Sequence, residues 1–197
     1  MNAIRGENNR ALKEWATACA ALRDGNQILL IRKGGIREEE GVFTVSDEEF
    51  FLIPTYDHQN EKQLQPQFVD TFNRTLASVP KPTAYQVDTY ARIVRIFIAS
   101  NEQQLLAASE EHIWNLDYIK QRFNFNPYNP LYLMVLRAYR IPRPIQIPML
   151  PEYGGCTSWV TLENCLSTKG AVPSLSENVF NARLEALCNK LHDLKSH

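Results

Sequence analysis

Two adjacent pairs of glycines stand beside side chains that could contact a ligand. The chain has only eight glycines, so the placement of four of them in two pairs requires an explanation. Arg32 and Lys33 come directly before Gly34 and Gly35, at the end of a short apolar run. Glycine accepts positive φ angles, and successive amide N–H groups can then form an anion-binding nest beside the two cations. The segment predicts either a phosphate-binding turn or a plain tight turn between strands.

The second glycine pair, at 154–155, stands in a segment rich in polar and aromatic groups. The predicted ligand contacts in this segment are Tyr153, Gly155, Cys156, Ser158 and Trp159. Aromatic faces beside amide groups recognise planar ligands, which favours a base-stacking or small-ligand pocket. A nucleophilic thiol at Cys156 is an alternative, although no histidine or aspartate lies close to it in the sequence. The structural alternative is a glycine turn leading into a strand, with Trp159 packed inside.

A third polar cluster contains Thr55, His58 and Gln59 and follows an apolar run. His58 is a candidate general base, because histidine titrates near neutral pH. The alternative is the entry to a helix, in which Thr55 or Asp57 caps the next segment and His58 lies at the surface. We include all three residues of the cluster among the predicted ligand contacts.

No metal or cofactor is predicted. The acidic run Glu38 to Glu40 is either a set of metal ligands or a solvated turn, and adjacency in sequence does not make several oxygens converge on a cation. The four cysteines lack the CxxC spacing of zinc sites, and the histidines are scattered along the chain. We therefore expect a fold that is stable without metal and cysteines that stay reduced.

The composition is that of a globular domain, with 44% hydrophobic and 22% charged residues. The net charge of -1 gives no general attraction to nucleic acid, so any site for a polyanion must be a local patch. The longest apolar run, Ile28 to Ile31, is far shorter than the roughly 20 residues that span a bilayer. Together with the polar N-terminal segment, this predicts a cytoplasmic protein without a membrane partner.

The hydrophobic pattern predicts an α+β fold with a small mixed or antiparallel sheet, peripheral helices and a C-terminal helix. Helices are expected at 9–23, 64–76 and 109–123, and after the capping box Ser174 to Glu177. Strands are expected at 27–32, 42–45, 49–54, 85–99, 131–140 and 157–162, the first three forming an antiparallel meander. Four prolines between Pro142 and Pro151 predict an extended arm without central-strand pairing.

We expect one α+β domain over 1–170 and a C-terminal helical extension over 171–197. Apolar residues recur along this extension in steps of four and three, which is typical of a packing seam. The seam consists of Phe180, Leu184, Leu187, Leu191 and Leu194. Each large side chain left exposed would cost about 1.5 to 3 kcal/mol. The seam is therefore expected to pack on the core, on a second copy or on another protein.

Four runs of the sequence resemble a bacterial family without an assigned activity. The runs are Lys13 to Ala16, Leu30 to Ile36, Phe50 to Gln59 and Tyr153 to Val160. Through them the chain is similar to the domain-of-unknown-function 1802 family over most of residues 10–165. The resemblance implies a conserved bacterial protein and supplies no catalytic residues.

A second resemblance is to the ASCH domains, RNA-linked members of the PUA-like barrel group. Their Gly-x-Lys-x-x-Glu-x-Arg motif falls here on Gly25, Gln27, Leu30 and Arg32, so the Gly and Arg positions match and the Lys and Glu positions do not. This resemblance implies a PUA-like barrel and an RNA ligand.

We expect a non-catalytic domain with an anion-tolerant pocket for RNA, DNA or a nucleotide, formed where the two glycine segments meet. One alternative is a PD-(D/E)xK-like nuclease fold, whose core has the same order of elements. That chemistry needs a Glu-x-Lys on its third strand, and Glu49 to Pro54 contains no lysine. The other alternative is a scaffold or assembly protein, which the C-terminal seam favours.

Overall fold

The computed structural model describes residues 3–33, 37–39, 42–44, 48–78, 84–126, 128–153 and 158–194. Within these residues, seven strands form one mixed sheet in the order β2-β7-β6-β5-β1-β8, with β9 paired to β7. They are β1 (Glu7–Trp15), β2 (Leu29–Lys33), β5 (Glu49–Thr55), β6 (Ala84–Ala99), β7 (Leu131–Pro148), β8 (Trp159–Ser167) and β9 (Val172–Pro173). A separate two-stranded sheet consists of β3 (Arg37–Glu39) and β4 (Val42–Thr44).

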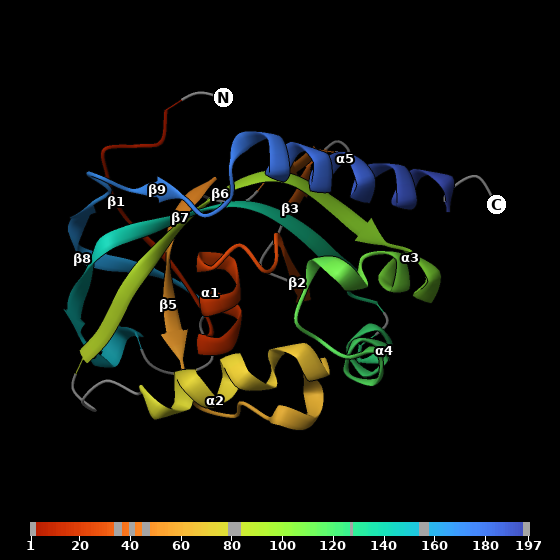
Figure 1. The fold of residues 1–197 in the computed structure, drawn as a ribbon, viewed down its shortest axis with the longest axis horizontal. Helices are drawn as coiled ribbons and strands as arrows, with labels where there is room; N and C mark the ends of the chain where they lie inside the picture. The colour runs from red at the N-terminus through yellow and green to blue at the C-terminus, as the bar shows by residue number, and fades with distance from the viewer. Residues whose placement is uncertain are drawn as a thin grey trace.

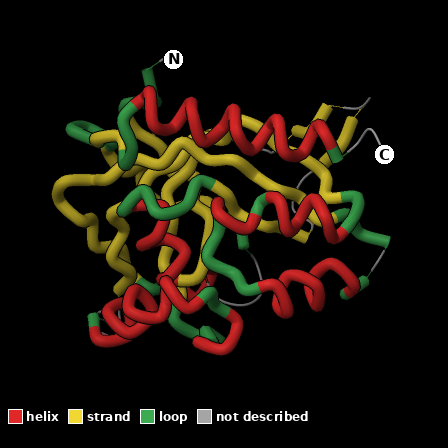
Figure 2. The backbone as a smooth tube through the Cα atoms, turned by 45° about the vertical axis from the view of Figure 1, so that its right-hand side comes forward, coloured by secondary structure: helices red, strands yellow, loops and turns green. Residues whose placement is uncertain are grey.

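Five α-helices in the described residues lie on both sides of the strands (Figures 1 and 2). They are α1 (Ala16–Arg23), α2 (Val69–Ala77), α3 (Glu102–Ala107), α4 (Leu116–Asn124) and α5 (Glu177–Asp193). In Figure 1, α1 lies beneath the arch of β6 and β7, α2 lies below α1, and α5 runs along the top of the sheet. The predicted α+β class, with a mixed sheet and a C-terminal helix, is confirmed. Among the described helices, none is long and apolar enough to cross a membrane.

The parallel pair β1 and β5 positions the later site. The two strands run side by side with Ala11 opposite Phe51 and Trp15 opposite Thr55, so their carboxyl ends lie together. Both outer neighbours of this pair, β8 and β6, are antiparallel to it. The helix α1 begins at the residue after β1, which brings its first turn to the same end of the sheet.

Apolar residues cover both faces of the sheet. Along β5, Phe50 and Leu52 belong to the larger core cluster, whereas Phe51 and Ile53 belong to the smaller one. Side chains of a strand alternate between its two faces, so a continuous apolar run is what a strand covered on both sides requires. The edge strands β2 and β8 do not pair with each other in the described residues, and the sheet is therefore open.

The predicted helix at 9–23 is wrong in its first half, because Glu7–Trp15 forms β1. The helical spacing of its apolar residues spans two elements. Ala11 and Leu12 are both fully buried and belong to different core clusters, as neighbours in a doubly covered strand do. The predicted antiparallel meander is also wrong. Instead, β2 pairs with β7, and β5 pairs with β1 and β6.

The predicted helix at 109–123 is wrong in its first part. Ser109–Glu111 is a short 3₁₀ turn, and α4 begins only after Asn115, whose side chain accepts a hydrogen bond of 2.9 Å from the Tyr118 amide. An N-cap of this kind ends the preceding extended segment and fixes the helix start. The helix α3 was not predicted, although Asn101 caps it in the same way. Likewise, the helix predicted from Leu64 begins at Val69, after two 3₁₀ turns.

The predicted proline arm is instead the second half of β7, which pairs with β6 as far as Pro148. The register shifts between Thr89, opposite Arg140, and Val87, opposite Ile145. Pro142 and Pro144 fall within this irregularity, where a missing N–H donor costs no ladder hydrogen bond. The prolines therefore bend the strand pair without ending it.

The helix α5 begins two residues later than its predicted capping box implies. Ser176 is the N-cap and accepts from the Val179 amide at 3.4 Å, while the Ser174 amide donates to Ala138 of β7. The seam residues Phe180, Leu187 and Leu191 are buried in the larger core cluster of the same chain.

Candidate functional site

A cavity of about 250 Å³, here called the aromatic cavity, opens at the carboxyl ends of β1 and β5. The end of β2 and the helix α4 with its preceding turn close its other sides. The lining residues are Lys13, Glu14, Trp15, Ile31, Arg32, Thr55, Trp114, Tyr118, Ile119 and Arg122. The chain thus brings together three aromatic rings and four charged side chains from segments far apart in the sequence.

The aromatic part of the lining is a cluster of three touching rings. The Trp15 and Trp114 ring centroids are 4.7 Å apart at an interplanar angle of 73°, which is an edge-to-face contact. The Tyr118 ring lies 4.7 Å from Trp114 and 6.4 Å from Trp15. Aromatic pairs of this geometry contribute about 0.5–1.5 kcal/mol beyond the burial of their area. The cluster therefore forms a well-packed side of the cavity. Trp15 is positioned by the end of β1, and Tyr118 by the helix that Asn115 caps.

An ion pair forms the polar wall of the aromatic cavity. Arg32 Nη1 donates to Glu14 Oε2 at 3.1 Å, and the two side chains are only 16% and 10% exposed. The other carboxylate oxygen of Glu14 accepts from the Trp15 amide at 2.9 Å, and the Thr55 hydroxyl donates to the Glu14 carbonyl at 3.1 Å. These bonds fix Glu14 and Arg32 at the junction of β1, β2 and β5.

Arg122 is the cation of the lining that is open to a ligand, since no ion pair to its guanidinium is present among the described residues. Its charge acts on its neighbours. Burial raises the pKa of Tyr118, and the Arg122 charge opposes part of that rise. Partial burial, and then Arg122, lower the pKa of Lys33. Lys13, Arg32 and Arg122 together outnumber the single carboxylate of Glu14, so the cavity carries a surplus of positive charge.

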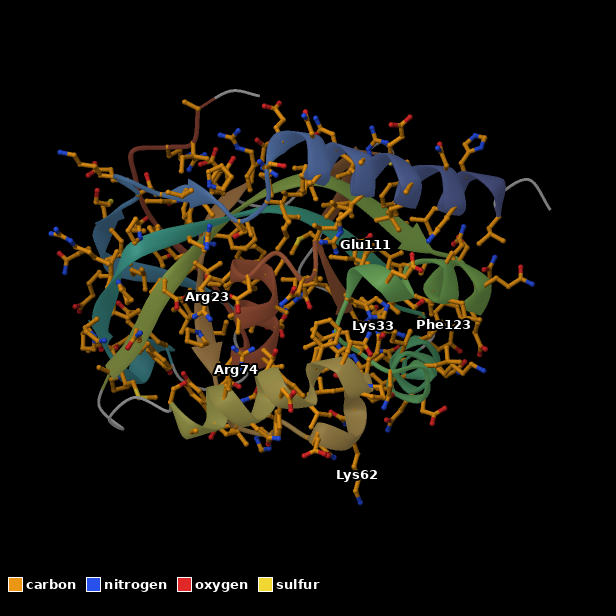
Figure 3. All side chains as sticks on the ribbon, viewed as in Figure 1. Arg23, Lys33, Lys62, Arg74, Glu111 and Phe123 are labelled. Carbon is orange, nitrogen blue, oxygen red and sulfur yellow. The ribbon has the colours of Figure 1, made fainter. Side chains whose placement is uncertain are left out.

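Lys33 does not line the cavity, but it fixes one wall of it. Its Nζ atom donates to the carbonyls of Arg122 at 3.1 Å and of Phe123 at 2.8 Å, at the last turn of α4. Figure 3 labels Lys33 and Phe123 on opposite sides of the view of α4. A cation at this end of a helix satisfies free carbonyls and the helix dipole. Lys33 therefore holds α4, with Tyr118 and Arg122, against β2.

Of the residues predicted as ligand contacts, Arg32 and Thr55 line the aromatic cavity. Gln59 lies at the start of α1, where its Oε1 accepts from the Thr17 amide at 3.2 Å and the Thr17 hydroxyl at 2.9 Å. His58 is exposed in a turn, with a φ of 61°. Gly34, Gly35, Gly155 and Cys156 lie outside the described residues.

The remaining predicted contacts approach β1 beside the cavity. Lys13 Nζ donates to the Tyr153 carbonyl at 2.7 Å, and the Lys13 amide donates to the Ser158 carbonyl at 2.8 Å. The Trp159 ring packs edge-to-face on Phe50, with centroids 4.8 Å apart. Thus Lys13 contacts the Tyr153 segment, while the next residue, Glu14, contacts Arg32.

Sequence reasoning missed Trp15, Trp114, Tyr118 and Arg122. Trp15 was assigned to a helix, and the other three were assigned to a core helix that begins too early. The available signal is the Asn115 cap followed three residues later by Tyr118, which places both aromatic residues of this segment around a helix start. Among the described residues, no group of three or more His, Cys, Asp or Glu side chains comes together as a metal site would require.

Comparison with known proteins places the chain in a family. Two crystal structures of mutants of ZmASCH from Zymomonas mobilis are similar to it. A serine-to-alanine mutant has 11% identity and a TM-score of 0.40, over 72% of this chain and 76% of that chain. A tyrosine-to-phenylalanine mutant has 12% identity and a TM-score of 0.43, over 79% and 90%. A comparison with curated proteins gives no match. The domain of unknown function family DUF1802 matches residues 11–186, and the chain belongs to that family.

Proposed function

We propose that the aromatic cavity binds a nucleotide, either free or as one unit of single-stranded RNA or DNA, without turning it over. The observation that carries the proposal is the meeting of a three-ring aromatic cluster with Arg32 and Arg122 in one cavity. A nucleotide combines a flat aromatic base with a negatively charged phosphate, and the lining offers a partner to each part.

The aromatic wall supports base binding. Stacking of a base on an aromatic side chain contributes roughly 1–3 kcal/mol and tolerates different bases. Trp15 and Tyr118 are only partly buried, so both rings keep surface for a ligand, whereas Trp114 is 6% exposed and packs behind them. The cluster therefore resembles a preformed platform.

The charged wall supports phosphate binding. A guanidinium group binds phosphate through two parallel N–H···O bonds, and such charge-assisted bonds are about twice as strong as neutral ones. The whole chain has a net charge of -1, so attraction for an anion must come from a local group of cations such as this one.

The lining favours binding over catalysis. Among its described residues there is no histidine or cysteine, and its single carboxylate, on Glu14, is held by Arg32 and by the Trp15 amide. Three of the five seam residues, Phe180, Leu187 and Leu191, are buried in the core of the same chain, which weakens the argument for a scaffold protein.

The proposal is tested by titrating the full chain with nucleoside monophosphates and with short single-stranded RNA and DNA, at two salt concentrations. Two of the three tryptophans line the cavity, so a Trp159→Phe background makes intrinsic fluorescence report on the site. We expect Arg122→Ala to weaken binding about 10- to 100-fold, the scale of a hydrogen bond to a charged group. Higher salt should weaken it further.

Arg143→Ala is the matched control, because it removes the same charge from an exposed position of β7 that does not line the cavity. Its affinity should equal that of the wild type. Absence of binding by the wild-type chain, or equal loss in both variants, would exclude the proposed function.

A further inference from the structure

A second cavity, of about 150 Å³ and here called the polar cavity, lies on one side of α1. Its lining residues are Ala16, Cys19, Ala20, Arg23, Pro54, Tyr56, Thr75, Ser78, Gln86 and Asp88. The four residues from α1 recur at helical spacing and form one stripe of that helix. Pro54 and Tyr56 come from the end of β5 and the residue after it, and Gln86 and Asp88 come from β6. The cavity thus lies between one stripe of α1, the end of β5, the start of β6 and the end of α2.

Small side chains create the space in the polar cavity. Ala16 and Ala20, one turn apart on α1, contribute only methyl groups to the lining. Figure 3 shows Arg23 on the side of α1 that faces β6, and this arginine closes one end of the stripe. The floor is therefore apolar, and the polar groups stand around it.

The charges of the polar cavity compensate one another. Arg23 Nη1 donates to Asp88 Oδ2 at 2.7 Å, and Arg23 Nε donates to Asp24 Oδ1 at 3.0 Å. A guanidinium held between two carboxylates offers no surplus positive charge to an anion. A cation would have to compete with Arg23 for the same carboxylates. The cavity therefore favours a neutral ligand.

Several hydrogen-bonding groups around the polar cavity remain open. The Tyr56 hydroxyl has no hydrogen bond within the described residues, and burial raises the pKa of this phenol, so it stays a donor. The Gln86 carbonyl oxygen accepts from Gln146 at 3.2 Å, and within the described part of the chain its amide nitrogen has no hydrogen bond. The Ser78 hydroxyl donates to the Thr75 carbonyl at 3.1 Å and keeps its lone pairs. Donors and acceptors are thus interspersed.

We infer that the polar cavity binds a neutral ring carrying several hydroxyl groups, such as an aldose or a cyclitol. Each hydroxyl both donates and accepts, which matches interspersed donors and acceptors better than a ligand with only one kind of group. The Tyr56 ring and the alanine methyls suit the carbon face of such a ring. A volume of about 150 Å³ leaves room for one such ring.

This inference is independent of the nucleotide proposed for the aromatic cavity. Its test is a titration of the full chain with D-ribose and with myo-inositol, followed by NMR shifts of the protein amides. Concentrations up to about 10 mM suffice for a millimolar Kd. We expect shifts around Tyr56, Ser78 and Gln86, and no change in affinity with salt, because no charge is bound.

Gln86→Ala and Gln146→Ala form a matched pair of variants, because the two amides bond each other and only Gln86 lines the cavity. Gln86→Ala should weaken ring binding at least about fivefold, the scale of one hydrogen bond, and Gln146→Ala should leave it unchanged. Ala20→Leu, which fills the cavity from α1, should abolish binding if its melting temperature shows that it folds.

Ribose 5-phosphate carries a hydroxylated ring and a phosphate, so it is the probe that distinguishes the polar cavity from the aromatic cavity. Arg122→Ala should not change the binding of D-ribose. Absence of shifts with both probes, equal loss in the two glutamine variants, or shifts confined to the aromatic cavity would each overturn the inference.

Discussion

The aromatic and polar cavities lie at the same end of the sheet but differ in their chemistry. Both are lined by consecutive parts of the segment 13–23, where β1 passes into α1. In the aromatic cavity, Arg32 meets one carboxylate, and Arg122 has no carboxylate partner among the described residues. In the polar cavity, Arg23 meets two carboxylates. The surroundings of each arginine, and not its presence, therefore determine whether a cavity attracts an anion.

The rings make the second difference. Three aromatic side chains surround one cavity, whereas the other has small residues from α1 and a single tyrosine. Two parallel strands that end together supply a hollow on either side of the following chain, and ligands of α/β sheets bind at such carboxyl ends. The side chains then decide which ligand each hollow accepts.

The largest expected effect is a loss of stability at low pH, caused by a buried histidine next to the aromatic cavity. His112 is fully buried behind the aromatic cavity, where its Nδ1 accepts from the Trp114 amide at 3.2 Å. Burial lowers the pKa of His112 to about 4, despite opposing backbone hydrogen bonds. The unfolded chain takes up this proton near pH 6.5, so stability should fall as the pH drops from 6.5 to 4, by about 3 kcal/mol.

Urea unfolding at pH 7 and at about pH 4.5 measures this loss, and His112→Asn should reduce it. His58→Asn is the control, because His58 is exposed and its positive φ is one that asparagine tolerates. An equal pH dependence in the wild type and in His112→Asn would show that His112 does not contribute.

The next effect is a gain of affinity in one cavity alone. Glu14→Gln removes the carboxylate that pairs with Arg32, and nucleotide binding should tighten about tenfold, or 1.4 kcal/mol. Asp88→Asn removes a carboxylate from the polar cavity and should leave nucleotide affinity unchanged. Isothermal titration of the two variants decides between them. Weaker binding by Glu14→Gln would mean that Glu14 positions Arg32 for the ligand. It would contradict the view that a carboxylate beside an arginine reduces the attraction of a cavity for anions.

The smallest effect concerns the support of the aromatic wall. Lys33→Ala removes two hydrogen bonds to the end of α4 and should lower stability by about 0.5–1 kcal/mol, with a modest loss of nucleotide affinity. Lys62→Ala is the control, since Lys62 points away from the molecule in Figure 3. Thermal melts of both variants measure the difference. Equal melting temperatures would show that α4 does not depend on Lys33.

Elements whose hydrophobic pattern keeps one period along their whole length were predictable from the sequence. The strand expected at 85–99 is β6, Ala84–Ala99, and the C-terminal helix was correctly placed to within a few residues. Residues 9–15 were not predictable from spacing, because a strand covered on both faces imitates a helical pattern where it joins α1. The second half of β7 was missed because its prolines fall in a register shift that spacing cannot reveal.

The site was predictable only where neighbouring residues share a function. Arg32 stood out because it precedes a glycine pair. The cluster of Trp15 and Trp114 did not, since the two rings come from segments far apart in the sequence and meet only through tertiary packing. Arg122 could not be predicted as a ligand contact, because the sequence does not show whether a carboxylate pairs with it. Among the described residues none does, and this depends on the tertiary structure.

The position of β1 in the sheet also governs how the protein is made. This strand pairs with β8, where Arg10 and Thr161 are 151 residues apart along the chain. At a synthesis rate of about 5–20 residues per second, β1 waits on the order of 10 s before that partner leaves the ribosome. Such long-range pairing also slows folding after release, because loop closure precedes any gain from contacts. Until β8 is made, newly synthesised chains therefore leave one backbone edge of β1 unpaired, and its free N–H and C=O groups favour aggregation or chaperone capture.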